Sequence, residues 1–241
     1  MALTNALTLD GSSQYVWRNA TGEPLPALSV NYTAESWCYI TGSILSGYHT
    51  IIDNGVHGGG GVTNFSTGYE GGGTSKFQHT MYAGGAFKHL VCNDTIVIDT
   101  WYHVAIVWDG SEFRAYVNGV KQTSTFTFAS HDTNSYKPSI GAWNNNGTFT
   151  YFFNGKIDEV RVSNSVRYTD NFTPSTTEFA SDGSTVSLFH LNADGDDVGP
   201  NDDDMGSVGT PTFTEGHVDD GGGGAPAATT PTPTALLLNV G

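Results

Sequence analysis

The stretch Thr100–Val120, TWYHVAIVWDGSEFRAYVNGV, decides the fold. Its first part, Trp101–Trp108, is a run of aromatic and β-branched residues, a composition that fits a half-buried strand. After the Asp109-Gly110 break, apolar and polar residues alternate over 113–117, as they do along a strand with one buried face. Asn118-Gly119 then predicts a tight hairpin turn. We therefore predict an antiparallel hairpin within an all-β protein.

The composition agrees with many short strands joined by tight turns. The 241 residues include 31 Gly, 13 Phe, 11 Tyr and 5 Trp, and no long stretch has the apolar spacing of a helix. Nine Lys and Arg against 24 Asp and Glu give a net charge of −15. Because phosphate binding needs clusters of Lys and Arg, we expect no nucleic acid partner and no anionic membrane surface. We also expect no membrane insertion.

The N-terminus and the cysteines bear on where the chain is made. Residues 1–10, MALTNALTLD, contain no basic region and no apolar core, so we expect no signal peptide and synthesis in a cytoplasm. Cys38 and Cys92 both fall on predicted strands. They either pair in a disulfide or remain buried free thiols, and no metal-site spacing involves them.

Several motifs together resemble a known family. Trp-Tyr-His-Val-Ala at 101–105, followed by Tyr-Val-Asn-Gly at 116–119, resembles the central signature of laminin-G-like domains in the concanavalin A-like lectin/glucanase superfamily. Residues 6–11 and 35–40 resemble its opening strands, and 153–163 its closing strands. The resemblance covers about residues 3–175. It implies an all-β fold, a two-sheet antiparallel jelly-roll sandwich, and is not specific to one function.

The character of the chain changes after Arg167, because no Lys or Arg follows it. The arrangement over 167–191 resembles the junction after laminin-G-like domains in tailed-phage virion proteins. We assign residues 1–192 to the sandwich and 193–241 to an acidic, glycine-rich linker with an extended Pro/Thr tail. The tail ends in an apolar segment with Leu236, Leu237 and Leu238, which is either a frayed terminus or a peg for subunit docking.

No catalytic pattern is present, and we predict that the protein is not an enzyme. Glucanases of the resembled superfamily share a Glu-x-Asp-x-x-Glu strand, and that spacing is absent from this sequence. Asp158 and Glu159 are adjacent, so a regular strand would direct them to opposite faces. His103 lies within the predicted 101–108 strand, where a packed, hydrogen-bonded core histidine is expected.

Calcium is the one cofactor that the sequence suggests. The resemblance implies a structural calcium near Asp10 and Asp158, which lie on the first and closing strands, and Asp53 is a further candidate. The alternative is that Asp-Gly and Asn-Gly pairs are ordinary turn residues. The acidic cluster 194–204 is either another calcium site or a solvated loop.

Aromatic and amide side chains suggest carbohydrate binding. Trp143, Asn144 and Asn145 stand together before a turn, and Tyr48-His49 has similar chemistry. Tyr69 lies in the glycine-rich stretch 56–75, which we predict to be a long exposed loop. Each of these residues is equally explained by a core or turn position.

Two functions fit these observations. The first is a non-enzymatic virion structural protein of a tailed phage, displayed on the particle surface as capsid decoration or as a tail appendage. Its partners would be other virion proteins, further copies in a homo-oligomer such as a trimer, and a host surface glycan. The alternative is a free-standing, calcium-dependent lectin.

Overall fold

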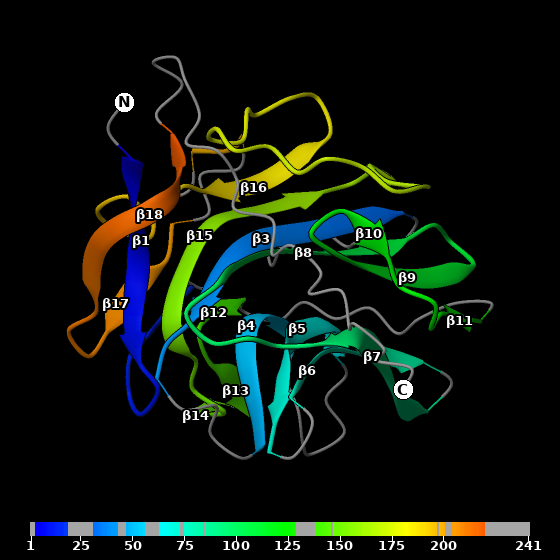
Figure 1. Cartoon of the computed structure of the whole chain (residues 1–241), viewed down its shortest axis with the longest axis horizontal. Coiled ribbons are helices and arrows are strands. Elements are labelled where there is room, and N and C mark those ends of the chain that lie inside the picture. The colour runs from blue at the N-terminus through cyan, green and yellow to red at the C-terminus, as the bar shows by residue number, and fades with distance from the viewer. Residues whose placement is uncertain are drawn as a thin grey trace, which may run out of the picture.

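The computed structural model describes residues 3–18, 31–42, 47–55, 63–72, 75–83, 85–128, 138–145, 147–196, 198–200 and 204–219. In these ranges the chain forms strands, turns and bends, and no helix. Within the described residues, no helix is long and apolar enough to cross a membrane. Two large antiparallel sheets pack against each other (Figure 1), which confirms the predicted all-β sandwich.

The first sheet contains the predicted hairpin and both ends of the described chain. Its strands follow the order β10 (Val120–Lys121), β9 (Glu112–Val117), β8 (Trp101–Trp108), β3 (Tyr32–Ile40), β15 (Asn154–Ser163), β1 (Leu3–Asp10) and β18 (Thr212–Asp219), with β11 (Phe126–Thr127) beside β9 and β16 (Thr185–Phe189) beside β15.

The second sheet faces the first, and a short ribbon stands beside it. The sheet order is β17 (Gly206–Val208), β2 (Tyr15–Trp17), β12 (Ser139–Ile140), β4 (Gly47–Gly55), β5 (Thr63–Gly71), β6 (Lys76–Ala83) and β7 (Ala86–Thr95). The ribbon is formed by β13 (Trp143–Asn145) and β14 (Thr148–Thr150).

The central hairpin has the predicted form. Strand β8 has the predicted bounds, and β9 pairs with it from Phe113 opposite Trp108 to Val117 opposite Val104. Asn118 and Gly119 adopt φ values of 49° and 74° and turn the chain from β9 into β10. Asn and Gly tolerate positive φ, which is why this pair favours such a turn.

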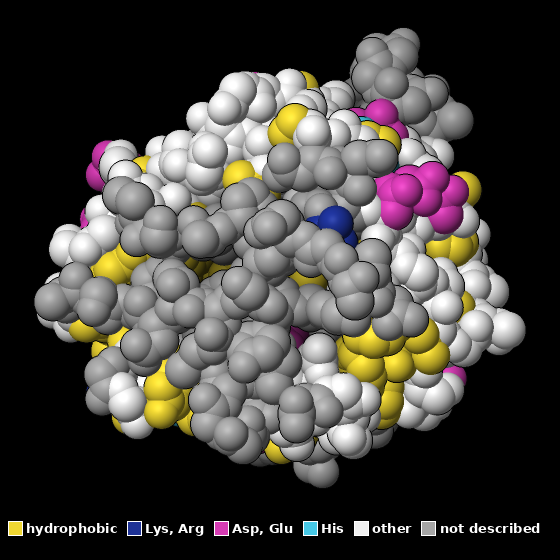
Figure 2. Space-filling model, turned by 180° about the vertical axis from the view of Figure 1, so that it is seen from behind, with side chains coloured by type: hydrophobic (Ala, Val, Ile, Leu, Met, Phe, Trp, Pro, Cys, Tyr) yellow, Lys and Arg dark blue, Asp and Glu magenta, His cyan; other side chains and the backbone are white. Residues whose placement is uncertain are grey.

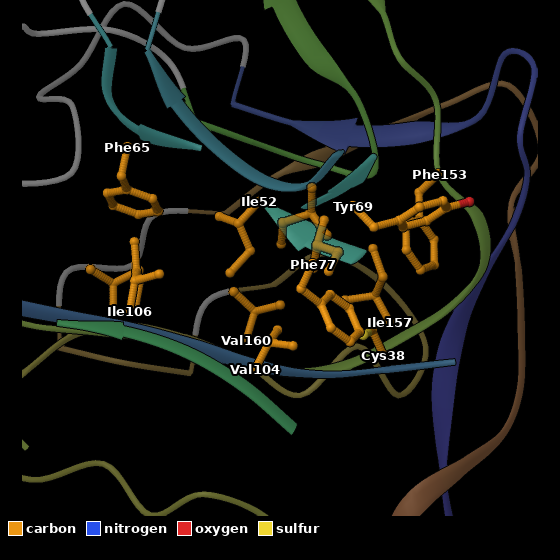
Figure 3. Packing of buried hydrophobic residues seen from close by; sticks show 14 of the residues in the cluster. Cys38, Ile52, Phe65, Tyr69, Phe77, Val104, Ile106, Phe153, Ile157 and Val160 are labelled. Atoms are coloured by element: carbon orange, nitrogen blue, oxygen red, sulfur yellow. The ribbon is translucent and has the colours of Figure 1, made fainter. Parts of the chain in front are cut away.

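The core lies between the two sheets (Figure 3). Inward side chains of the first sheet, such as Ile106 and Ile157, meet Phe65 and Phe77 from the second sheet. Each fully buried side chain of this size contributes about 1.5–3 kcal/mol relative to exposure. Cys38 and Cys92 both lie in this core as free thiols, so they do not pair in a disulfide.

The sandwich extends beyond residue 192, so the predicted linker is wrong over residues 204–219. Strand β17 pairs with β2, and β18 pairs with β1. The partners are about two hundred residues away in sequence, so a reading of neighbouring residues does not reveal the pairing. Residues 220–241, with Leu236, Leu237 and Leu238, lie outside the described residues.

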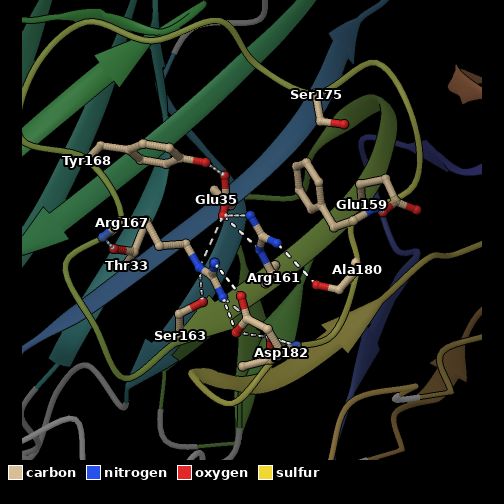
Figure 4. Close-up of polar contacts among 12 residues, drawn as sticks. Thr33, Glu35, Glu159, Arg161, Ser163, Arg167, Tyr168, Ser175, Ala180 and Asp182 are labelled. Carbon is tan, nitrogen blue, oxygen red and sulfur yellow. Dashed lines mark hydrogen bonds and ion pairs between the residues drawn. The ribbon is translucent and has the colours of Figure 1, made fainter.

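The chain between β15 and β16, the outer strap (residues 164–184), crosses the outer face of the first sheet. Its Phe172 and Tyr168 pack on an outward apolar cluster that includes Tyr116. Beneath it, the wholly buried Glu35 of β3 accepts hydrogen bonds from Arg161 Nη2 at 2.6 Å and Tyr168 Oη at 2.7 Å (Figure 4).

His103 Nε2 lies 3.1 Å from Glu35 Oε2, so His103 is buried and hydrogen-bonded as predicted.

Candidate carbohydrate-binding site

The β13–β14 ribbon is fixed to strand β4 by hydrogen bonds of its backbone. The N–H of Asn144 donates to Asp53 Oδ2 at 3.1 Å, and Asn144 Oδ1 accepts the N–H of Gly147 at 2.8 Å, which closes the turn. Just after β14, the N–H of Thr50 donates to the carbonyl of Tyr151 at 2.9 Å. The ribbon is therefore held in one position at the edge of the sandwich.

Three aromatic rings meet where this ribbon joins β4, and we call Tyr48, Trp143 and Tyr151 the aromatic group. The Trp143 ring lies 5.2 Å from Tyr48 and 5.1 Å from Tyr151, at angles of 85° and 61°. Such edge-to-face contacts stabilise aromatic pairs. Tyr48 is buried, Trp143 is half-buried and Tyr151 is 48% exposed, so the group presents a supported aromatic surface to solvent.

The polar side chains that share a face of the ribbon with Trp143 are uncharged. Asn145 is exposed, and because side chains alternate along a strand, it shares a face of the ribbon with Trp143. The register places Thr148 opposite Asn145 and Thr150 opposite Trp143, on that same face. Burial raises the pKa of the Tyr48 hydroxyl well above its usual range, so this side chain is neutral. Aromatic surface beside amide and hydroxyl groups is suited to a neutral polar ligand.

The structure gives the six predicted sugar-contacting residues different positions. It brings Tyr48 and Trp143 together, with Asn145 exposed nearby, whereas Asn144 is buried as the turn residue. His49 and Tyr69 face the interior, where their rings stack at 4.8 Å.

The predicted loop over 56–75 is wrong in its described part, because most of that part is a strand of the second sheet. This strand places Tyr69 in the interior, next to His49 of β4. Residues 63–71 form β5, which pairs with β4 and places Tyr69 opposite His49.

Sequence reasoning does not single out Tyr151. Its exposure depends on a positive φ of 54° just after β14 and on the backbone bond to Thr50, which joins residues about a hundred positions apart. The run of alternating Thr and aromatic residues from Thr148 to Tyr151 is the one local signal that a ribbon leads into this position.

The three predicted calcium ligands are not brought together. Asp10 on β1 is opposite Asn154 of β15, and Asp158 lies four residues further along, about 13 Å away at the rise of a strand. Asp53 lies on the other sheet.

Each of the three carboxylates has its own partners. Partial desolvation raises the pKa of Asp10, but hydrogen bonds from the amides of Ser12 and Ser13 outweigh it and lower the pKa to about 2. Asp10 is therefore a turn residue. Asp53 and Asp158 are buried and accept backbone N–H groups of Asn144 and His217. Of the acidic cluster 194–204, residues 197 and 201–203 lie outside the described ranges.

On the face in Figure 2, acidic side chains gather in one patch and Lys or Arg side chains are scarce, in keeping with the net charge of −15.

A two-sheet antiparallel sandwich of this topology is the fold of lectin-like domains. The laminin G model of the concanavalin A-like lectin/glucanases superfamily matches residues 10–171, and the chain belongs to this family. Among proteins with curated descriptions, none matches this chain in sequence.

Several solved structures are similar in fold. A candidate carbohydrate-binding protein of Bacteroides ovatus shares 16% identity with a TM-score of 0.64, over 89% of this chain and 60% of its own length. The CBM40 domain of the Ruminococcus gnavus IT-sialidase shares 17% identity with a TM-score of 0.53, over 68% of this chain and 92% of that one.

A heptameric SAP-like pentraxin of Limulus polyphemus shares 15% identity with a TM-score of 0.51, over 68% of this chain and 78% of that one. At these identities the comparisons show the fold alone. The chain spans less than two thirds of the Bacteroides protein.

Proposed function

We propose that this protein is a non-enzymatic carbohydrate-binding domain whose ligand contacts Trp143, Tyr151 and Asn145. The observation that carries the proposal is the aromatic group, in which the exposed Tyr151 is backed by the ring of Trp143 on the ribbon and the ring of Tyr48 on β4. The apolar faces of sugar rings pack on aromatic surface, and amide and hydroxyl side chains bond to sugar hydroxyls. Two of the structural neighbours are described as carbohydrate-binding proteins or modules.

The expected ligand is a neutral glycan. The side chains that form the exposed surface are uncharged, and the whole chain carries −15, which would repel acidic sugars such as sialic acid.

A glycan array with the purified chain tests this proposal. Tyr151→Ala should weaken binding to the best neutral hit by about 2- to 10-fold, as expected for one aromatic contact. Phe87→Ala is the matched control, because Phe87 is 40% exposed on β7 in a different part of the second sheet. An array without hits, or equal affinities of wild type and Tyr151→Ala, would refute the assignment.

Calcium is proposed as a structural cofactor of this binding. The acidic cluster 194–204 offers the oxygen ligands that calcium prefers, whereas Asp10, Asp53 and Asp158 accept hydrogen bonds from backbone N–H groups. The array is therefore run with calcium and with a chelator, and equal binding in the two conditions would exclude calcium dependence.

We further propose that the domain is displayed on the surface of a tailed-phage particle, as capsid decoration or as a tail appendage. The support is the arrangement over 167–191, which resembles the junction in such virion proteins, together with the apolar end at 236–238. Docking through Leu236, Leu237 and Leu238 would join copies into an oligomer, with a trimer as the expected state.

Mass in solution and localisation in intact particles test this second proposal. Deleting residues 235–241 should abolish the oligomer, whereas a chain that is monomeric and never co-purifies with particles would overturn the virion role.

A further inference from the structure

Four ionisable side chains gather on the outer face of the first sheet, away from the aromatic group. Asp158 and Glu159 come from β15, Glu178 from the outer strap and His190 from the residue after β16. One ligand atom each of Glu159, Glu178 and His190 lie within 4.8 Å of one another. His190 Nδ1 is 2.6 Å from Glu159 Oε1.

A β-bulge places both neighbouring carboxylates on this face. A regular strand would direct them to opposite faces, but Glu159 has a φ of 52° and the register with β3 shifts between Asp158 and Arg161. Asp158 Oδ2 therefore accepts the N–H of His217, and Glu159 Oε2 accepts that of Phe179. The prediction that Asp158 and Glu159 point to opposite faces of the strand is therefore wrong.

Both carboxylates are buried, and of the two only Glu159 has a basic side chain, His190, as a partner in the described residues. Asp158 and Glu159 are both 0% exposed, and Asp158 Oδ1 has no hydrogen-bond partner in the described structure. Burying a carboxylate without a partner is unfavourable. The nearby Arg161 donates instead to Glu35 and to a carbonyl of the outer strap.

We propose that Glu159, Glu178 and His190 bind a divalent transition-metal ion, and that zinc fits best. One imidazole nitrogen with two carboxylate oxygens suits zinc, whereas calcium takes oxygen ligands alone. Ligands about 2.1 Å from a tetrahedral ion lie roughly 3.4 Å apart, so small side-chain movements within the observed 4.8 Å suffice.

The surroundings favour such a site. Glu178 is half-buried and His190 has 21% of its side chain exposed, so an ion can enter from solvent. Asn192 Nδ2 donates to Glu178 Oε1 at 2.8 Å and orients that carboxylate, as outer partners of metal ligands do. The ion would join the outer strap to β15 and to the end of β16.

Titration of the chelator-stripped full chain with zinc tests this proposal, by calorimetry and by native mass spectrometry. Wild type should bind one equivalent and unfold at a higher temperature with zinc than without it. His190→Gln should lower the affinity of this equivalent at least 10-fold. His89→Gln should leave it unchanged, because His89 is an exposed histidine on the edge strand β7.

Glu178→Gln is a second variant in case His190→Gln does not fold, and it should also lower the affinity at least 10-fold, because one carboxylate ligand is lost. The proposal is overturned if wild type binds no zinc, if both site variants retain the equivalent, or if His89→Gln loses it. Binding of calcium in preference to zinc would overturn the assignment of the ion.

Discussion

Replacing Glu35 by Gln should destabilise the protein by about 3 kcal/mol at neutral pH. The side chain of Glu35 is 0% exposed and accepts hydrogen bonds from Arg161, Tyr168 and His103. Gln keeps the size of the side chain but removes its charge, which leaves the buried Arg161 without its counter-ion. Breaking a buried pair in this way costs about 3–5 kcal/mol, and the remaining amide oxygen offsets part of it.

The pH dependence provides an independent estimate. Burial raises the pKa of Glu35, but the hydrogen bond and charge of His103 and the charge of Arg161 outweigh it and lower the pKa from 4.5 to about 2. A difference of about 2.5 pH units corresponds to about 3 kcal/mol. Because the folded-state pKa is lowered, this stability is present above about pH 4.5 and is lost as the pH falls toward 2.

Urea unfolding of both proteins between pH 7 and pH 3 measures the effect. The difference between wild type and Glu35→Gln should shrink by about 2 kcal/mol over this range. Asp182→Asn is the matched control, because Asp182 also binds an arginine, Arg167, but is half exposed. It should cost less than about 1 kcal/mol at pH 7. A loss below 1 kcal/mol for Glu35→Gln, or a pH-independent difference, would show that the network does not hold the outer strap.

Three further predictions concern the core and the backbone. Phe113→Ala, at a wholly buried position of β9, should cost about 3–5 kcal/mol in urea unfolding. Gly155→Ala should cost about 1–3 kcal/mol of stability, because φ is 146° and a Cβ would lie 2.0 Å from a carbonyl oxygen. In the control Gly183→Ala the added Cβ meets nothing within 4 Å, so stability should change by under about 0.5 kcal/mol. Equal losses of stability in the two variants would contradict this reasoning. Cys38 and Cys92 should react with a thiol reagent only in denaturant, because burial raises the pKa of both thiols, and modification of the native protein would refute their burial.

Much of the candidate site could be named from the sequence, but its assembly could not. Trp143, Asn145 and Tyr48 carry the right chemistry wherever they lie, and local pattern identifies them as candidates. Their proximity depends on bonds between the ribbon and β4, and those bonds also exclude Asn144 from the surface. Tyr151 becomes part of the group through its backbone conformation, which no side-chain pattern reports.

The sequence by itself determined the central hairpin, because alternation over Phe113–Val117 and the Asn118-Gly119 pair act within a few residues. Only the tertiary structure decided which strands join across the chain. The edge of β1 pairs with residues 212–219 in the first sheet, although the sequence analysis assigned them to a linker.

The same distinction applies to the carboxylates of β15. Whether Asp158 and Glu159 share a face depends on a bulge against β3, a strand more than a hundred residues earlier. The periodicity of a sequence reflects interactions between residues that are close in sequence. The pairing of strands and the burial of side chains depend on partners that the fold brings from far along the chain.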